Sequence, residues 1–392
     1  MTTHLYYDEN KCAYCYGEQI GCTRCLTVCP NQAITERVAR SVRGESIVNQ
    51  KITVNFQVCN ESGNCITACP TGALTNTVIT LPQHIMLLRQ KLRSFYQQHS
   101  KHSVVLFHDV DLYQLVNSLS DTIVSIEINQ LNSFGIESWL TCLVNGARKV
   151  IFLHQLEAPI EVVTTLDTQL QYARILLQAL GYDKTALQLI GYQEINYIKT
   201  ELTEHFGNET DKIQIAPLNT DELLENKRDV LRVAMNHLYQ NAPYKPVSVD
   251  LPAYAPFGQV LLNNQACTLC FSCVTVCPTH AFSAGQQQPQ LYFSEHLCIQ
   301  CQLCVKACPE NVLTLQPRFA FLAQLEQTTR LLHEELPFQC ISCGKAFATQ
   351  TLINAIMKKL QNHAMFQGEA AKRLQMCETC RIKATVQANE VT

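Results

Sequence analysis

The sequence predicts an α+β protein in which two cysteine-rich modules flank a small α/β domain with a parallel sheet, followed by a helical four-cysteine tail. Three observations support this prediction. All but one of the 21 cysteines lie in groups before residue 70 or after residue 266. The middle of the chain alternates apolar runs of strand length with amphipathic helical patterns. Two Cys-x2-Cys pairs follow near the C-terminus.

Two identical cysteine motifs lie side by side in the C-terminal half. Both read Cys-x2-Cys-x2-Cys-x3-Cys-Pro, from Cys267 to Pro278 and from Cys298 to Pro309. Three thiolates at this spacing lie on one loop around an iron–sulfur cube, and the fourth cysteine serves the neighbouring cube. The pattern resembles bacterial two-cluster ferredoxins, and a pair of zinc knuckles is the weaker alternative. We expect two [4Fe–4S] clusters, with the ligand sets Cys267, Cys270, Cys273, Cys308 and Cys298, Cys301, Cys304, Cys277.

The N-terminal segment repeats this theme imperfectly. Its first motif, Cys22-x2-Cys25-x3-Cys29-Pro30, has Gln19 where the first cysteine is expected. Cys12 and Cys15 lie just upstream, and either could replace it through a longer loop. We favour Cys15, so that one [4Fe–4S] cluster is held by Cys15, Cys22, Cys25 and Cys69. A zinc site made of Cys12, Cys15, Cys22 and Cys25 is an alternative, but it leaves Cys29 and Cys69 without a role.

The second N-terminal motif has Ser62 in place of its middle cysteine. Cys29, Cys59 and Cys65 remain at the correct spacing for a second cluster. Three thiolates can hold [3Fe–4S], or [4Fe–4S] with Ser62, Cys12 or solvent on the last iron. An empty site with relic cysteines is the remaining alternative.

Composition narrows the classes of function. The chain has 392 residues and 47% hydrophobic content, enough for cores in several domains. The net charge of −3 and the lack of a basic block argue against a nucleic-acid partner. No apolar run reaches the ~18 residues of a membrane span, and the first residues do not resemble a secretory signal. We therefore expect a cytoplasmic protein whose clustered cysteines bind metal rather than form disulfides.

Residues 81–240 are predicted to form an α/β docking domain. No glycine-rich nucleotide motif is present, and Cys142, His108 and His154 have no catalytic context in the sequence. Thr164 and Asp167 are expected to form a capping box at the start of one helix. The predicted helices are Leu81–His99, Ser138–Val144, Thr164–Leu180 and Thr220–Tyr239, and the predicted strands are Ser103–Phe107, Thr122–Ile128, Val150–Leu153 and Leu187–Ile190.

The remaining boundaries follow from the motifs. We expect an N-terminal module over residues 1–80, a proline-rich linker over 241–259, the intact cysteine module over 260–316 and a tail over 317–392. A helix is predicted from Pro317 to about Leu336. The tail pairs Cys340-x2-Cys343-Gly344 and Cys377-x2-Cys380 are typical of a structural zinc site. A further iron–sulfur cluster is less favoured, because these pairs lack a third cysteine and a Cys-Pro ending.

With these motifs in order, the chain resembles the polyferredoxin-type 4Fe–4S dicluster proteins that accompany bacterial formate dehydrogenases. The resemblance implies a non-catalytic electron carrier that relays electrons through its clusters to or from a partner oxidoreductase of the formate dehydrogenase kind. One alternative is an accessory or redox-sensing iron–sulfur protein that assists a dehydrogenase without carrying its electrons. An autonomous flavin enzyme is a third alternative, which would require flavin absorbance.

Overall fold

The computed structural model describes residues 4–16, 19–39, 49–98, 103–109, 112, 123–194 and 224–389. The chain forms two compact units. The first contains the residues up to Gly258 together with the short segments Ile299–Cys301 and Pro317–Glu326. The second contains the rest of the C-terminal cysteine module and the tail. Each unit is described by itself below.

A four-stranded parallel sheet lies at the centre of the first unit. The strand order is β10-β9-β7-β8, and all three neighbouring pairs are parallel. The strands are nearly continuous apolar runs, as expected for a parallel sheet that is covered on both faces. Their bounds are Val104–His108 (β7), Ile123–Glu127 (β8), Lys149–His154 (β9) and Leu187–Gly191 (β10). The predicted parallel α/β layer is therefore confirmed.

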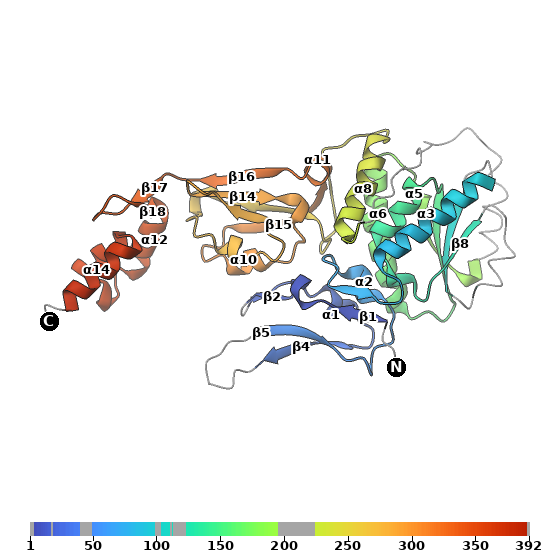
Figure 1. Ribbon diagram of the computed structural model, residues 1–392, viewed down its shortest axis with the longest axis horizontal. Coiled ribbons are helices and arrows are strands. Elements are labelled where there is room, and N and C mark those ends of the chain that lie inside the picture. Colours follow the sequence, from blue (N-terminus) through green and yellow to red (C-terminus); the bar gives the residue numbers. More distant parts are fainter. Residues whose placement is uncertain are drawn as a thin grey trace. The chain divides into compact units, whose positions relative to one another are not determined.

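The main helices of this unit pack on one face of the sheet (Figure 1). The crossovers β8–α5–β9 and β9–α6–β10 run in the same direction along the sheet, and right-handed crossovers of this kind place their helices on the same face. Trp139, Phe107 and Phe152 lie in the core between these layers. The helices are α3 (Leu81–Gln98), α5 (Ile136–Val144), α6 (Ile160–Ala179) and α8 (Lys227–Gln240).

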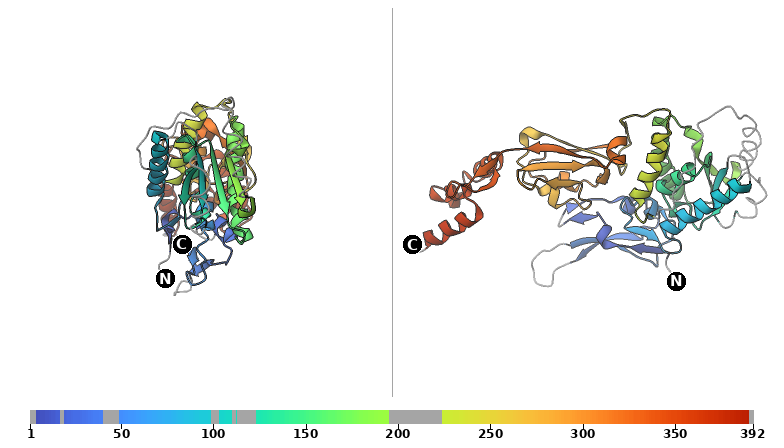
Figure 2. Two further views of the ribbon diagram at one scale, coloured as in Figure 1. Left: turned by 90° about the vertical axis from the view of Figure 1, so that its right-hand side faces the viewer. Right: turned by 45° about the horizontal axis from the view of Figure 1, so that its top comes forward.

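The N-terminal cysteine module belongs to the same compact unit as the sheet (Figures 1 and 2). Its short helix α2 packs against α6 and against the 3-10 turn η3 (Leu131–Ser133). Asn64 on α2 is fully buried, and its side-chain amide donates to the carbonyl oxygens of Val28 and Glu161 and to Thr165 Oγ1. The elements are β1 (Leu5–Tyr7), β2 (Cys15–Tyr16), β3 (Gln19–Ile20), α1 (Arg24–Val28), β4 (Ile34–Ala39), β5 (Asn49–Val54), α2 (Asn64–Ala68) and β6 (Leu74–Asn76).

The C-terminal cysteine module is built from short strands around an apolar core that includes Phe282, Leu291 and Phe293. One of its sheets has the order β13-β14-β16, and β12 pairs with β15. Its elements are β12 (Gly258–Leu262), α9 (Ser272–Thr275), β13 (Phe282–Ala284), β14 (Gln290–Ser294), α10 (Leu303–Ala307), β15 (Leu313–Ala320) and β16 (Thr329–Glu334). Two neighbouring elements, β11 (Ser248–Asp250) and α11 (Phe321–Leu325), belong to the first unit, where β11 pairs with the end of β15. The helix predicted from Pro317 to about Leu336 is wrong, because β16 pairs with β14 and only α11 is helical.

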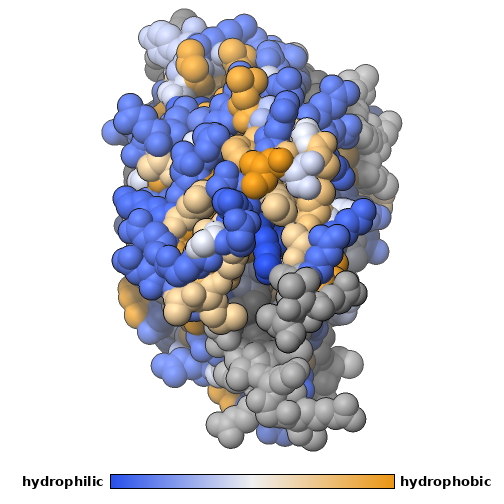
Figure 3. Space-filling view, turned by 90° about the vertical axis from the view of Figure 1, so that its left-hand side faces the viewer, coloured by the Kyte–Doolittle hydropathy of each residue, from blue (hydrophilic) through white to orange (hydrophobic). Residues whose placement is uncertain are grey.

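The tail begins with a small hairpin of β17 (Pro337–Gln339) and β18 (Ala346–Thr349). The helices α12 (Gln350–Leu360), α13 (Glu369–Lys372) and α14 (Glu378–Asn389) follow. Thr349 caps α12, since its hydroxyl accepts a hydrogen bond from the Leu352 backbone N–H at 3.1 Å. Figure 3 shows a face of the molecule on which hydrophilic residues predominate and hydrophobic ones lie between them.

Two details of the middle domain differ from the prediction. The third predicted helix begins at Ile160 with Pro159 at its N-cap, so Thr164 and Asp167 lie inside the helix and form no capping box. Asp167 instead pairs with Arg174 at 2.9 Å. Of the helix predicted from Thr220, residues 220–223 lie outside the described residues, and α8 begins at Lys227. Within the described part of the chain, no helix is both long enough and apolar enough to cross a membrane.

Candidate metal centres

The cysteine loops share an unusual backbone conformation. In the N-terminal module, Glu61 and Gly63 flank Ser62 with φ of 56° and 75°. In the C-terminal module, Gln300 and Gln302 flank the middle cysteine with nearly the same values, 55° and 72°. Left-handed backbone is costly for residues other than glycine, and successive turns of this kind aim N–H groups at an anion. The N-terminal loop therefore has the same local backbone conformation as its C-terminal counterpart, although its middle residue is a serine.

A second feature is common to all four motifs. The residue three positions after the last cysteine has positive φ, and the next strand begins two residues later. These residues are Gln32 (51°), Gly72 (68°), His280 (54°) and Asn311 (52°). The backbone N–H of Ala33 donates to Cys29 Sγ at 3.2 Å, and that of Ala281 donates to Cys277 Sγ at the same distance. Hydrogen bonds of this type to cysteine sulfurs tune iron–sulfur clusters.

One complete four-cysteine group lies in the C-terminal module. Cys267, Cys270 and Cys273 from the first motif and Cys308 from the second line one small cavity of about 20 Å³. Burial raises the pKa of Cys273 to about 12, and the nearby thiols of Cys270, Cys267 and Cys308 add to the shift. A positively charged partner favours the thiolate form of such a group. The residues fit a [4Fe–4S] cluster with one ligand from the neighbouring motif, as the sequence predicts.

The other C-terminal motif supplies the second predicted set, which consists of Cys298, Cys301, Cys304 and Cys277. Cys298 and Cys304 are buried, and Cys277 and Cys301 are partly buried. The αL backbone around the middle cysteine matches that of the Ser62 loop, as described above. Their joint role as cluster ligands stays a prediction.

The N-terminal module brings together Cys12, Cys22, Cys25 and Cys69. These four residues line a cavity of about 20 Å³, the same size as the C-terminal one. Burial raises the pKa of Cys25, and the nearby thiols of Cys69, Cys22 and Cys12 raise it further. Cys15, which the sequence favoured, lies instead on β2, where it pairs with Ile20 of β3.

A short hairpin explains why Cys12 takes this place. The strands β2 and β3 pair as a hairpin. At the base of this hairpin, the backbone N–H of Cys22 donates to the carbonyl oxygen of Ala13 at 2.9 Å. Cys12 therefore lies next to Cys22 in space, although nine residues separate them in the sequence. The preceding 3-10 turn is capped by Asp8, which accepts from the Asn10 N–H at 3.0 Å. Cys12 is thus positioned by two local hydrogen-bonded turns.

The second N-terminal group contains three cysteines, as predicted. Burial raises the pKa of Cys65 to about 12, and the thiols of Cys59, Cys29 and Cys69 add to the shift. Cys29, Cys59 and Cys65 line the same cavity as the buried Ser62. This cavity measures about 190 Å³, far more than the two four-cysteine cavities. The residues fit an iron–sulfur cluster with three thiolate ligands.

Two cationic side chains lie against the N-terminal groups. Arg24 Nη1 is 3.5 Å from Cys22 Sγ, and the same guanidinium donates to the carbonyl oxygen of Tyr254. Lys227 Nζ donates to the carbonyl oxygens of Ile66 at 2.8 Å and Cys69 at 3.4 Å. These two contacts were not evident from the sequence, because both cations lie far along the chain from one of their partners.

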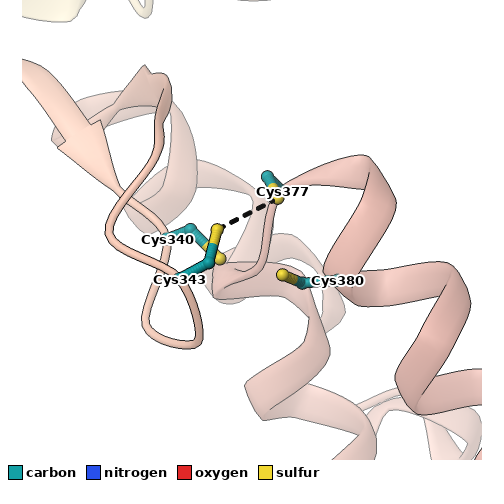
Figure 4. A group of neighbouring side chains, drawn as sticks. All are labelled: Cys340, Cys343, Cys377 and Cys380. Carbon is teal, nitrogen blue, oxygen red and sulfur yellow. Dashed lines mark hydrogen bonds between the residues drawn. The ribbon is translucent and has the colours of Figure 1, made fainter.

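The tail pairs converge on a single point (Figure 4). The sulfurs of Cys340, Cys343, Cys377 and Cys380 all lie within 4.8 Å of one another, with 3.7 Å between Cys343 and Cys377. Zinc–sulfur bonds of about 2.3 Å in a tetrahedron place sulfurs about 3.8 Å apart, whereas sulfurs bound to different irons of a cube lie farther apart. Among the described residues, no other group of three or more potential ligands converges this closely. The geometry fits one tetrahedral ion.

The electrostatics of the tail also suit a metal ligand. Desolvation opposes ionisation of Cys340, but backbone hydrogen bonds at Cys377, Cys343 and Ser342 outweigh it and lower the pKa of this thiol to about 6. Gly344, with φ of 72°, allows the tight turn in which its N–H donates to the Cys340 carbonyl at 2.9 Å. A thiolate held by such a turn is ready to bind a cation.

The three middle-domain candidates have structural surroundings. Cys142 is fully buried in the helical layer, and its thiol is 3.6 Å from the Ser138 carbonyl. His108 is also buried and hydrogen-bonds Ser125 Oγ at 2.8 Å. His154 contacts the backbone carbonyl of Gln155 at 2.8 Å.

Comparison with known families gives three matches. Models of a 4Fe–4S dicluster domain match residues 20–73, 266–313 and 297–349. The last match also covers the first cysteine pair of the tail. A search of curated proteins finds no match. The chain therefore carries 4Fe–4S dicluster ferredoxin domains both before and after the residues that form its parallel sheet.

Proposed function

We propose that this protein is a cytoplasmic electron carrier with four iron–sulfur clusters, two in each dicluster domain. The observation that carries the proposal is the grouping of cysteines from two successive motifs around one cavity, in both domains. In two-cluster ferredoxins, each motif supplies three ligands to one cluster and its fourth cysteine to the other cluster. Such paired clusters lie close together, which suits electron transfer between them.

The proposed ligand sets follow the motifs with one change. Cys12 replaces Cys15, so that Cys12, Cys22, Cys25 and Cys69 hold one N-terminal [4Fe–4S] cluster. Cys29, Cys59 and Cys65 hold the second N-terminal cluster. The C-terminal sets are Cys267, Cys270, Cys273, Cys308 and Cys298, Cys301, Cys304, Cys277. Thiolates bind the iron in every set, and no residue of this chain serves as an acid, base or nucleophile.

The tail is proposed to hold one structural zinc ion. The support is the close approach of its four sulfurs, which suits one ion better than a cube with four separate irons. The family match over residues 297–349 favours the alternative of a further cluster, because it covers Cys340 and Cys343. The sulfur geometry is the more specific of the two observations, and zinc would clamp a segment that has little apolar core of its own.

The proposed partner is an oxidoreductase of the formate dehydrogenase kind. This step rests on the resemblance of the motif order to the dicluster proteins associated with those enzymes. The α/β domain is proposed to dock the partner. Its packing against the N-terminal module, through Asn64 and Lys227, would hold these clusters in a fixed place beside the docked enzyme.

A reduction assay tests this proposal. The protein is mixed anaerobically with formate and a catalytic amount of a bacterial formate dehydrogenase, and bleaching of its visible absorbance is followed. Rapid bleaching that needs both formate and enzyme would support the proposal. A cluster-loaded protein that dithionite reduces, but that formate and the enzyme do not, would contradict this partner and leave the electron-carrier function standing.

The Ser62 site favours a second candidate, a redox-sensing accessory protein. A cluster with three cysteine ligands loses iron more readily than one with four, so its loss could report oxidation. In that case oxidation would change partner binding, and reduced protein would not deliver electrons to a dehydrogenase. Measuring affinity for the partner before and after mild oxidation separates the two candidates.

A further inference from the structure

Helix α12 attaches the tail to the C-terminal cysteine module within the second compact unit. Thr349, the last residue of β18 and the N-cap of α12, donates its hydroxyl hydrogen to the carbonyl oxygen of Thr268 at 3.1 Å. Both residues are buried, with 2% and 4% of their surface exposed. Near the other end of α12, Lys359 Nζ pairs with Glu310 Oε1 at 2.9 Å. Two contacts, one at each end of the helix, therefore hold α12 on the module.

Both contacts of α12 reach the same candidate cluster site. This site (the Cys270 site) is the one proposed for Cys267, Cys270, Cys273 and Cys308. Thr268 lies between the first two of these cysteines in the sequence, and Glu310 comes two residues after the last one. Thr268 and Glu310 also line the cavity around which the four cysteines are grouped. The tail therefore supports this site at two points, one in each of the motifs that supply its ligands.

The loop that Thr349 contacts has a backbone conformation that needs support. Leu269 and Phe271, on either side of Cys270, have φ of 51° and 59° although neither is glycine. Left-handed backbone at such residues costs free energy and persists only when the surrounding structure holds it. The hydrogen bond from Thr349 ends at the carbonyl of Thr268, the residue immediately before Leu269. Because Cys270 is exposed, opening of this loop would bring solvent to the proposed ligand.

The tail has little besides its cysteines to keep α12 in position. Its buried residues, among those described from 337 to 389, are Cys340, Thr349, Ile353 and Cys377. Two of these four are proposed metal ligands. The first cysteine pair lies in the loop between β17 and β18, and the second pair lies at the start of α14 (Figure 4). A bound metal ion would thus join the hairpin that ends at Thr349 to the last helix, and metal binding would supply much of the free energy that keeps the tail folded.

We propose that the tail metal ion limits access to the Cys270 site, and that Thr349 is the residue that positions the ligand loop of this site. The inference rests on the proposed function, because it requires a cluster at this site and a metal ion in the tail. When the ion is lost, the tail unfolds locally, the contacts at Thr268 and Glu310 are released, and the loop around Cys270 opens to solvent. Loss of one metal site thus makes the other labile.

Iron extraction under anaerobic conditions tests this proposal. Loaded full-length protein is incubated with the ferrous chelator bathophenanthroline disulfonate, alkylated with iodoacetamide and analysed by mass spectrometry. Alkylation of a cysteine reports loss of the cluster that protected it, so each site is followed separately. In Thr349→Val, which removes the hydroxyl and keeps the shape of the side chain, alkylation of Cys270 and Cys273 should be about fivefold faster, the change in the opening equilibrium that one lost hydrogen bond brings. Thr349→Ser keeps the hydroxyl and should behave like the natural protein.

A second variant tests the role of the tail metal. Cys377→Ser should lose the tail zinc and accelerate alkylation at the Cys270 site at least as strongly, whereas alkylation of Cys22 and Cys25 in the N-terminal module should stay unchanged. The double variant Thr349→Val/Cys377→Ser should be no faster than Cys377→Ser alone, since both changes release the same loop. The matched control is Lys372→Met, which breaks an exposed pair with Glu369 inside the tail and should change neither rate.

The possible outcomes separate this inference from the proposed function. Unchanged rates in both Thr349→Val and Cys377→Ser, or equal acceleration in both modules, would overturn the inference and leave the electron-carrier function standing. Acceleration in only one of the two variants would overturn the coupling between the tail metal and Thr349. A natural protein that binds no iron at the Cys270 site would instead overturn the proposed function.

Discussion

Lys227 joins the α/β domain to the N-terminal cysteine module, and replacing it should cost more stability than any surface charge. Its ammonium group donates to the carbonyl oxygen of Ile66 at 2.8 Å and lies 3.6 Å from Glu137 Oε1. Both side chains are shielded, with 13% and 3% of their surface exposed. The same carboxylate oxygen accepts the Gly135 N–H at 3.1 Å. The variant Lys227→Met removes the charge and keeps most of the apolar stem.

The expected loss is about 3–5 kcal/mol of unfolding free energy, because the Glu137 carboxylate is left buried without its cation. The lost hydrogen bond to Ile66, worth about 1.5–3 kcal/mol for a charged donor, is part of that figure and not an addition to it. The double variant Lys227→Met/Glu137→Gln removes the stranded charge. Its loss of unfolding free energy should therefore be smaller than the sum of the losses in the two single variants, by at least about 1 kcal/mol.

Urea unfolding followed by tryptophan fluorescence measures this loss. Trp139 is the only tryptophan of the chain and is 1% exposed in the core of the α/β domain, so its signal reports this domain. The matched control is Asp229→Asn on the same helix, whose pair with Arg232 is half exposed. We expect the control to cost about 1 kcal/mol or less. A loss below about 1 kcal/mol for Lys227→Met would show that Lys227 does not compensate the buried Glu137 carboxylate.

Three further predictions concern the cysteines and a buried histidine. Cys12→Ser should lower the iron content by about four atoms per chain while Cys15→Ser leaves it unchanged, and the reverse result in iron and sulfide analysis would restore Cys15 as the ligand. Cys377→Ser should remove about one zinc and no iron; loss of iron instead would show that the tail holds a cluster. Burial lowers the pKa of His84, stacked on Phe134, to about 3. The pKa of His84 in the folded protein lies below the unfolded value of about 6.5, so His84 contributes stability above about pH 6.5 that is lost as the pH falls. The urea midpoint of the natural protein should therefore fall between about pH 7.5 and 5, and the midpoint of His84→Leu should change less over the same range.

Much of the fold could be predicted because its signals are local. The strands of the parallel sheet are mostly apolar runs. The helix predicted from Leu81 begins at that residue and is described as far as Gln98. Gly146 and Gly181 take positive φ after α5 and α6, as expected for helix ends. The cysteine spacings were equally informative, because three ligands on one loop fix the local backbone.

The structure differs from the sequence-based prediction where contacts between residues far apart in the chain determine the local structure. The segment after Pro317 forms β16 because its backbone pairs with β14, about 40 residues earlier in the chain. Cys12 lines one cavity with Cys22, Cys25 and Cys69 because the hairpin of β2 and β3 brings Cys12 close to Cys22. Sequence spacing alone favoured Cys15, which is nearer to Cys22 in the chain. The large cavity at Ser62 depends on η3, which lies far along the sequence and gave no signal of its own.

The most direct test of the central claim is a metal count on anaerobically purified protein, combined with EPR of its oxidised and reduced states. We expect about 15–16 iron atoms with matching sulfide and one zinc per chain, with reduced spectra of interacting [4Fe–4S] clusters. About 8 iron atoms per chain would contradict it. In that case the N-terminal module would hold no clusters, and this protein could not carry electrons through both dicluster domains.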